Sequence, residues 1–254
     1  MESMTEHTTL GYTLDHTVLT YDIETRRRMT VAALVKLMQE AAMQNVIELK
    51  VSAWDLEPHN ISWVLFRKSL HINRLPRIGE HIRVVTYPAG FEKAFTYRDY
   101  KVFNEEGTLL ASSSTTWLLL DMAERRMVRI PPFILAFGPL MPPADQCLPR
   151  PCSRLPRFEH ADRSVPFRVN WHDLDFNGHL NNVYYIQWML EALPDDVLKT
   201  ATLQAFDIFY KVEAHWKDGL LSEIQPLDDL RFLHRLIRIE DGKEVAQGMS
   251  RFGG

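Results

Sequence analysis

The chain has 254 residues, of which 46% are hydrophobic and 24% are charged, as in an ordinary globular protein with room for one large domain or two small ones. Its 29 basic and 33 acidic residues nearly balance at a net charge of −4, so no global field points to nucleic acid or to a membrane surface. The sequence has neither a signal-peptide pattern nor an apolar run long enough to cross a bilayer, so we expect a cytoplasmic protein without stable membrane insertion.

The first predicted helix begins after Thr30, which is a suitable N-cap. Leu34, Leu37, Met38 and Ala41 follow at i, i+3, i+4 and i+7, the spacing of one buried helix face. Four strand-like segments come next, at roughly 62–72, 81–88, 94–104 and 109–119. This order predicts an α+β module over residues 1–130.

A proline-rich stretch at 131–160 separates this module from the rest of the chain. Helix and sheet interiors both reject such a density of proline, so we expect an ordered but irregular connector. Cys147 and Cys152 lie within it. They form neither a metal-ligand pattern nor a disulfide framework, and so few cysteines suit a reducing compartment.

Residues 161–254 repeat the order of the first module. Val183, Ile186 and Leu190 predict a helix that Asn181 or Asn182 caps and that Pro194 ends. Strand-like segments follow at roughly 203–212, 221–226, 230–239 and 243–251. The sequence therefore predicts two tandem α+β modules, each a helix with an antiparallel sheet.

Three polar residues precede the second helix at intervals of two: Asp175, Asn177 and His179. In an extended segment this spacing places a carboxylate, an amide and an imidazole on one side of the chain. Such groups can activate water and transfer protons, and the helix N-terminus can stabilise a developing oxyanion. Asp and Asn are also ordinary turn and capping residues, so a structural role is the alternative. His172 and His179 alone do not make a metal site, and we expect no metal or other cofactor.

The segment 171–186, WHDLDFNGHLNNVYYI, resembles the signature of acyl-acyl-carrier-protein (acyl-ACP) thioesterases. The segments 37–42, 63–67, 112–117 and 125–131 resemble further parts of this family, and the likeness extends over about residues 10–252. The resemblance implies a double hotdog fold, in which each of two modules wraps a sheet around a long helix. It also implies hydrolysis of a fatty acyl-ACP thioester to a free fatty acid and holo-ACP.

The resemblance also implies which residues act. The family's catalytic Asp, Asn and His fall on Asp175, Asn177 and His179. Its catalytic Glu, on the strand after the second helix, falls on Glu213 in the segment 210–213. Plant members often have Cys after that Glu, whereas this chain has Ala214. We therefore expect a carboxylate and histidine mechanism, by either direct attack of water or an acyl-aspartyl intermediate.

The remaining expectations concern the substrate. The acyl chain would bind in the first module beside Leu34, Met38, Ala41 and Trp63, with Asn181 and Asn182 near the thioester. The basic residues Arg26, Arg27, Arg28, Arg67 and Lys68 are candidates for docking an acidic carrier protein. A homodimer is left open.

The internal repeat predicts a single active site. If Thr30 corresponds to Asn182, the first-module counterparts of the motif are Ile23, Thr25 and Arg27, which cannot do the same chemistry. Three alternative functions stay open: an acyl-CoA thioesterase of the related hotdog group, an acyl-binding module without catalysis, and a dehydratase of hotdog type.

Overall fold

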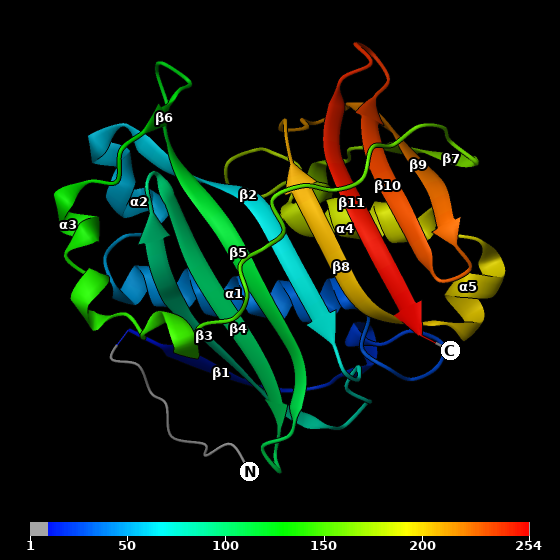
Figure 1. Ribbon diagram of the computed structural model, residues 1–254, viewed down its shortest axis with the longest axis horizontal. Helices are drawn as coiled ribbons and strands as arrows, with labels where there is room; N and C mark the ends of the chain where they lie inside the picture. Colours follow the sequence, from blue (N-terminus) through cyan, green and yellow to red (C-terminus); the bar gives the residue numbers. More distant parts are fainter. Residues whose placement is uncertain (1–9, 254) are drawn as a thin grey trace. The chain divides into compact units, whose positions relative to one another are not determined.

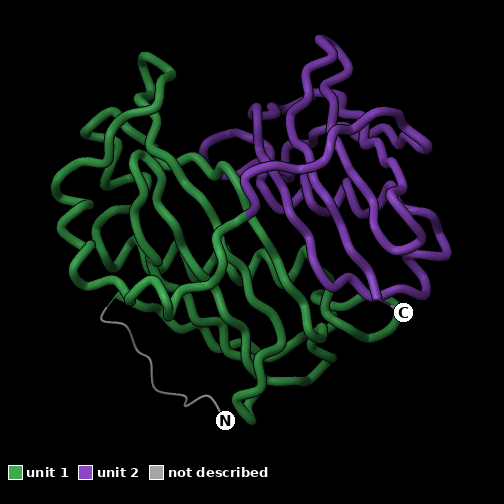
Figure 2. Tube along the Cα trace, viewed as in Figure 1, with its two compact units in different colours: residues 1–151 green, residues 152–254 purple. Residues whose placement is uncertain are grey.

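The structure is a computed structural model that describes residues 10–253, and the chain divides into two compact units, residues 1–151 and 152–254 (Figure 2). Each unit consists of one principal helix and an antiparallel sheet (Figure 1). The predicted α+β class and the tandem hotdog modules are confirmed. The unit boundary falls inside the connector that the prolines predicted. Among the described residues, none of the helices is long and apolar enough to cross a membrane.

Unit 1 has strand order β1-β3-β4-β5-β2, with every neighbouring pair antiparallel and the short β6 paired to β5. Its elements in chain order are β1 (Tyr12–Thr17), η1 (Thr20–Asp22), α1 (Val31–Glu48), α2 (Ala53–Leu56), η2 (Glu57–His59), β2 (Ile61–Ile72), β3 (His81–Glu92), β4 (Phe95–Asn104), β5 (Leu109–Asp121), β6 (Met127–Val128), α3 (Pro132–Leu135), η3 (Gly138–Leu140) and η4 (Ala144–Gln146).

Helix α1 begins where the sequence predicted. The side chain of Thr30 accepts a hydrogen bond from the Ala33 amide at 3.0 Å, which satisfies one of the free N–H groups of the first turn. Leu34, Met38 and Ala41 are fully buried, as their spacing requires. Burying a leucine or methionine side chain contributes about 1.5–3 kcal/mol, so this face stabilises the helix against the sheet.

Unit 2 has strand order β7-β9-β10-β11-β8, again antiparallel throughout, which is the order of unit 1. Its elements are β7 (Arg163–Arg168), η5 (Trp171–Asp173), α4 (Asn182–Glu191), α5 (Asp195–Thr200), β8 (Thr202–Tyr210), β9 (Gly219–Asp228), β10 (Arg231–Arg238) and β11 (Glu244–Gly253). Helix α4 buries Val183, Ile186 and Met189, and the Ser222 hydroxyl of β9 donates to the Trp188 carbonyl at 3.0 Å.

The predicted strands match β2–β5 and β8–β11 to within a few residues. Strands β1 and β7 were not predicted. Each pairs with only one neighbour at the edge of its sheet, and its side chains are mostly half-buried or exposed, so its sequence lacks a strong apolar alternation. Pro194 does not simply end α4, because it is the N-cap of the unpredicted helix α5.

The connector is ordered because its two parts bind different units. Up to Pro151 it belongs to unit 1, where the Leu148 amide donates to Asp99 Oδ2 at 2.8 Å and Arg150 donates to the Ala89 carbonyl at 2.7 Å. Beyond Pro151 it belongs to unit 2, where the Glu159 amide donates to Gln225 Oε1 at 2.8 Å. Cys147 and Cys152 form no disulfide.

The repeat extends to the loops. Residues 20–30 and 171–181 have the same succession of a 3-10 turn, a bridge, a tight turn, a second bridge and a helix N-cap. Thr30 therefore corresponds to Asn181, not to Asn182, and the predicted alignment was wrong by one residue. A polar N-cap followed by a helix gave no signal strong enough to choose between two adjacent asparagines.

Candidate active site

The segment that carries the motif is a turn, not the extended segment that the sequence predicted. The Asp175 amide donates to the His179 carbonyl at 2.7 Å, and Gly178 adopts a positive φ of 77°. Asp175 Oδ1 accepts hydrogen bonds from the amides of Asn177 at 2.9 Å and His179 at 3.1 Å. The carboxylate of Asp175 therefore fixes the shape of the turn from within, as Asp commonly does.

The turn leads directly into α4. The Asn181 side chain caps the helix by accepting from the Val183 amide at 3.1 Å. The amides of Leu180 and Asn181 are used internally, by the carbonyls of Ala214 at 2.8 Å and Asp173 at 2.9 Å. Of the three amides from Leu180 to Asn182, only that of Asn182 donates to no group within residues 10–253. It is the candidate donor to an oxyanion at this helix N-terminus.

Glu213 lies in the loop after β8 rather than on the strand, because β8 ends at Tyr210. Two side chains hold this loop. The Arg238 guanidinium donates to the Glu213 carbonyl at 2.7 Å, and the Tyr185 hydroxyl of α4 accepts from the Ala214 amide at 3.0 Å. Burial is the main cause that raises the pKa of Tyr185 well above its usual range, so its hydroxyl stays neutral.

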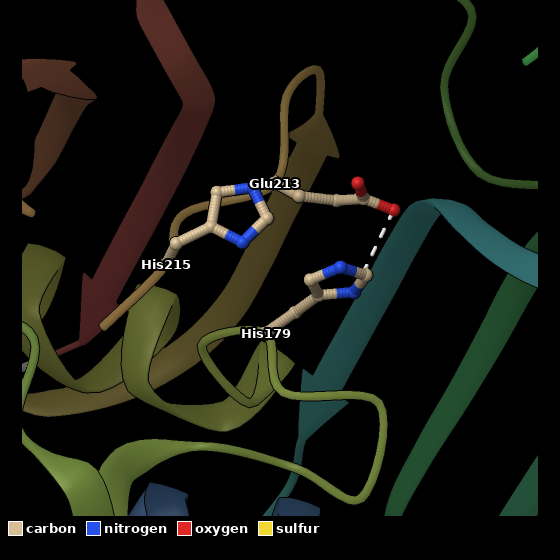
Figure 3. Close-up of side chains that lie close together, drawn as sticks. All are labelled: His179, Glu213 and His215. Atoms are coloured by element: carbon tan, nitrogen blue, oxygen red, sulfur yellow. Dashed lines mark ion pairs between the residues drawn. The ribbon is translucent and has the colours of Figure 1, made fainter.

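His179 and Glu213 come together across the turn and the loop (Figure 3). His179 Nδ1 lies 3.6 Å from Glu213 Oε1, and the two side chains are 23% and 27% exposed. Catalytic hydrogen bonds are often long without substrate, so this separation suits a base and an imidazole that act together. The ring of His215 lies 5.0 Å from that of His179, centroid to centroid and edge-on.

The other two predicted catalytic residues, Asp175 and Asn177, lie on the same turn as His179. The Asp175 carboxylate contacts the backbone amide of His179, not its imidazole ring. The side chain of Asn177 is exposed on the same turn. Sequence reasoning missed Tyr185 and His215. His215 follows Glu213 by two positions, and this Glu-x-His spacing was the signal that was available.

Unit 1 has the same turn without the same chemistry. At the corrected alignment the counterparts of Asp175, Asn177 and His179 are Glu24, Arg26 and Arg28, instead of Ile23, Thr25 and Arg27. Partial burial of Glu24 would raise its pKa, but hydrogen bonds from the Arg26 amide and from the Arg28 and Arg26 side chains lower it below its usual value.

The second half of the site is also absent from unit 1. The bridge of His179 with His215 corresponds to a bridge of Arg28 with Arg77. Two residues before Arg77 stands the buried Leu75, in the place of Glu213. Unit 1 thus has two arginines and a leucine where unit 2 has two histidines and a glutamate.

The residues predicted to line the acyl site lie in unit 1. Leu34, Met38 and Ala41 are fully buried in its core. Trp63 is half-buried, donates from Nε1 to the Val51 carbonyl at 2.8 Å and packs against the buried cluster that includes Leu56 and Ile134. These contacts are those of a protein core.

The predicted docking residues are not equivalent. Arg26 and Arg28 pair with Glu24 at 3.2 Å, whereas Arg27 is exposed at the tip of the turn. Arg67 lies over the Phe66 ring. Lys68 is wrong as a docking residue, because it is only 5% exposed and lies over the Tyr100 ring at 5.1 Å. Burial lowers the pKa of Lys68 to about 8.

Comparison with known proteins shows the family of this chain. The family model of the acyl-ACP thioesterase N-terminal domain matches residues 10–137, and that of the C-terminal domain matches residues 158–253. These matches cover most of both units. The chain belongs to the acyl-ACP thioesterase family.

Curated relatives are distant in sequence. The chain is 25% identical to a palmitoyl-acyl carrier protein thioesterase of Cuphea hookeriana over 96% of its own length and 62% of that protein's length. It is 24% identical to an oleoyl-acyl carrier protein thioesterase of Arabidopsis thaliana, with 94% and 75% covered. The chain therefore spans less than two thirds of the first of these relatives.

Solved structures share the fold at lower identity. A 12:0-ACP thioesterase from Umbellularia californica matches with a TM-score of 0.85 and 20% identity, over 96% of this chain and 97% of that one. An acyl-ACP thioesterase from Bacteroides thetaiotaomicron matches with a TM-score of 0.83 and 18% identity, over 98% and 100%. Both confirm the double hotdog fold.

Proposed function

We propose that this chain hydrolyses fatty acyl-ACP to a free fatty acid and holo-ACP. The observation that carries this proposal is the approach of His179 Nδ1 to Glu213 Oε1 at 3.6 Å, beside the N-terminus of α4. Both side chains are partly exposed, so water and a thioester can reach them. Membership of the family supports the same reaction.

The groups of unit 2 suit attack by water. Glu213 takes a proton from water, and the water oxygen forms a bond to the thioester carbonyl carbon. The Asn182 amide and the positive end of α4 stabilise the negative charge on the carbonyl oxygen, and one such donor contributes about 3 kcal/mol. When the carbon–sulfur bond breaks, His179 relays the proton from Glu213 to the departing thiolate, and Asn177 holds the water or the substrate.

Covalent catalysis by Asp175 is the second route to the same products. Its carboxylate would attack the carbonyl carbon, expel the thiolate and leave an acyl-aspartyl anhydride for water to cleave. The hydrogen bonds that Asp175 Oδ1 accepts from its own turn favour the first route, because they commit that oxygen to the backbone. Single-turnover hydrolysis in heavy-oxygen water tests this route: label in the Asp175 carboxylate supports the anhydride, and an unlabelled carboxylate excludes attack of water on its aspartyl carbonyl.

The proposal also covers how the acyl chain and the carrier protein bind and where in the cell the protein acts. Unit 1 holds the acyl chain beside Leu34, Met38, Ala41 and Trp63, while Asn181 and Asn182 lie next to the thioester. Of the basic candidates, Arg27 is the one that a carrier protein would meet first, because it is exposed at the tip of the turn, whereas Arg26 and Arg28 pair with Glu24. A cytoplasmic location is supported by Cys147 and Cys152, which form no disulfide.

The test is hydrolysis of acyl-ACP and acyl-CoA that carry the same acyl chain. We expect kcat/KM to be greater for acyl-ACP, with release of free fatty acid. A greater value for acyl-CoA would assign the chain to CoA thioesters instead. Tight binding of either substrate without release of fatty acid would make it an acyl-binding module.

A further inference from the structure

His179, Glu213 and His215 surround a common space in unit 2 (Figure 3). Each offers one nitrogen or oxygen atom, and these atoms all lie within 4.8 Å of one another. His179 Nδ1 and Glu213 Oε1 are 3.6 Å apart. Two ligands of a tetrahedral zinc ion are separated by about 3.4 Å, given bond lengths near 2.1 Å, so rotation of the side chains can bring the three atoms to this spacing.

The backbone already holds these three residues in place. His179 and His215 form an antiparallel bridge, and the Leu180 amide donates to the Ala214 carbonyl at 2.8 Å. The His215 amide donates to Asp218 Oδ2 at 2.9 Å, which fixes the far side of the loop. A ligand set whose backbone is fixed in advance loses little conformational freedom when an ion binds.

The chemistry of the set selects a class of ion. Two imidazoles and one carboxylate are the donors of known zinc sites with an open fourth position, whereas Mg²⁺ and Ca²⁺ prefer sets made of oxygen alone. His215 is exposed and the other two are partly exposed, so an ion can enter from solvent. We propose that His179, Glu213 and His215 form a Zn²⁺-binding site within the candidate active site.

Occupancy of this site has a consequence that rests on the proposed function. An ion bound to Glu213 and His179 takes the lone pairs that would accept the proton of water and relay it. Zn²⁺ is therefore an inhibitor of hydrolysis in this account, not a resident cofactor. Unit 1 provides an internal contrast, because its counterparts Arg28, Leu75 and Arg77 cannot bind a cation.

The test measures binding on the full chain without an affinity tag and without substrate. We use Co²⁺ as a spectroscopic probe, because Co²⁺ absorbs visible light when it is bound in a four-coordinate site of nitrogen and oxygen ligands. The bound Co²⁺ is then displaced with Zn²⁺. We expect one equivalent per chain. His215→Gln and Glu213→Gln should each weaken Zn²⁺ binding by more than about tenfold, because each removes a direct ligand. His172→Gln and His160→Gln, at exposed histidines outside the set, should bind as the unaltered chain does.

Two results would overturn the site: no visible absorption with Co²⁺ together with no binding of Zn²⁺, or unchanged affinity in His215→Gln. Circular dichroism of each variant ensures that a loss reflects the ligand and not the fold. The outcome is independent of the proposed function. A chain that binds Zn²⁺ through these residues but hydrolyses no thioester would refute the proposed function alone, and a chain that hydrolyses acyl-ACP without binding Zn²⁺ would refute the metal site alone.

Discussion

Glu24 in unit 1 and Asp175 in unit 2 occupy the same position of the same turn, and each carboxylate accepts a hydrogen bond from the amide two residues later. The distances are 3.1 Å from the Arg26 amide to Glu24 Oε2 and 2.9 Å from the Asn177 amide to Asp175 Oδ1. The turn thus needs this acceptor even in the unit whose histidine and glutamate positions hold arginine and leucine. We therefore expect Asp175 to act first by positioning the turn.

This relationship predicts different results for two substitutions of Asp175. Asparagine keeps a side-chain oxygen that can accept from the Asn177 and His179 amides, whereas alanine leaves both amides without an acceptor. We expect Asp175→Asn to retain turnover within about tenfold, and Asp175→Ala to lose most of its turnover while it stays folded. The comparison is of kcat for the two variants. Equal loss in both would mean that the negative charge itself takes part in the reaction.

Tyr185 should act on catalysis through the loop of Glu213. Tyr185→Phe removes the hydroxyl that accepts from the Ala214 amide, and Ala214 is fully buried. A buried amide without a partner costs about 1–3 kcal/mol, so we expect lower stability and, because the adjacent Glu213 becomes less fixed, a lower kcat with little change in KM.

Tyr184→Phe is the matched control for Tyr185→Phe, since its ring precedes that of Tyr185 on α4 and is only half-buried. Urea unfolding and steady-state kinetics of both variants check the prediction. A Tyr185→Phe protein with normal stability and normal kcat would show that the hydroxyl does not hold the loop.

Lys68→Met should stabilise the protein. The Lys68 ammonium group is buried over the Tyr100 ring, and burial alone lowers its pKa to about 8. Methionine has a similar shape and no charge to desolvate, so we expect a gain of about 1–3 kcal/mol in the free energy of unfolding near neutral pH. Lys36→Met, at an exposed position of α1, should change stability by less than about 0.5 kcal/mol. Destabilisation by Lys68→Met would contradict this reading.

His234 should make the protein less stable in acid. Its imidazole is fully buried in unit 2, bonded to Ser250 Oγ at 2.7 Å, and burial lowers its pKa to about 3. Between pH 6.5 and pH 3 the unfolded chain takes up a proton that the folded chain does not. The free energy of unfolding therefore falls as pH decreases through this window, by at most about 1.4 kcal/mol per pH unit from this residue, and is unaffected by it above the window.

The contribution of His234 is isolated by comparing unfolding at pH 7.5 and pH 4.5. His234→Gln should be less stable than the unaltered chain at pH 7.5 but should lose less stability on acidification. His172→Gln, at an exposed position, should leave the difference between the two pH values unchanged. The same acid sensitivity in His234→Gln as in the unaltered chain would refute the assignment.

The fold was largely predictable because its signals are local. The spacing of Leu34, Met38 and Ala41 fixes the buried face of α1, and the turn glycines Gly107 and Gly242, both at positive φ, mark the hairpins that repeat between the units. Edge strands β1 and β7 carry no such pattern, because only one side of each is paired.

The candidate site was predictable in its residues but not in its geometry. Spacing suggested an extended segment, whereas the carboxylate of Asp175 folds the chain back on itself. The approach of Glu213 to His179 depends on Tyr185 and Arg238, which lie on a helix and a strand far from the motif, so no local pattern reveals it. His215 becomes noticeable only once the bridge with His179 is seen.

The most direct test of the proposed chemistry is the steady-state hydrolysis of acyl-ACP by Glu213→Gln, next to Glu240→Gln as a matched change at an exposed glutamate of the same unit. Glutamine keeps the size of the side chain but cannot accept the proton of water, so we expect kcat to fall by about 10²–10⁴. Glu240→Gln should match the unaltered chain. Turnover by Glu213→Gln at the rate of the unaltered chain would contradict the assignment of Glu213 as the base.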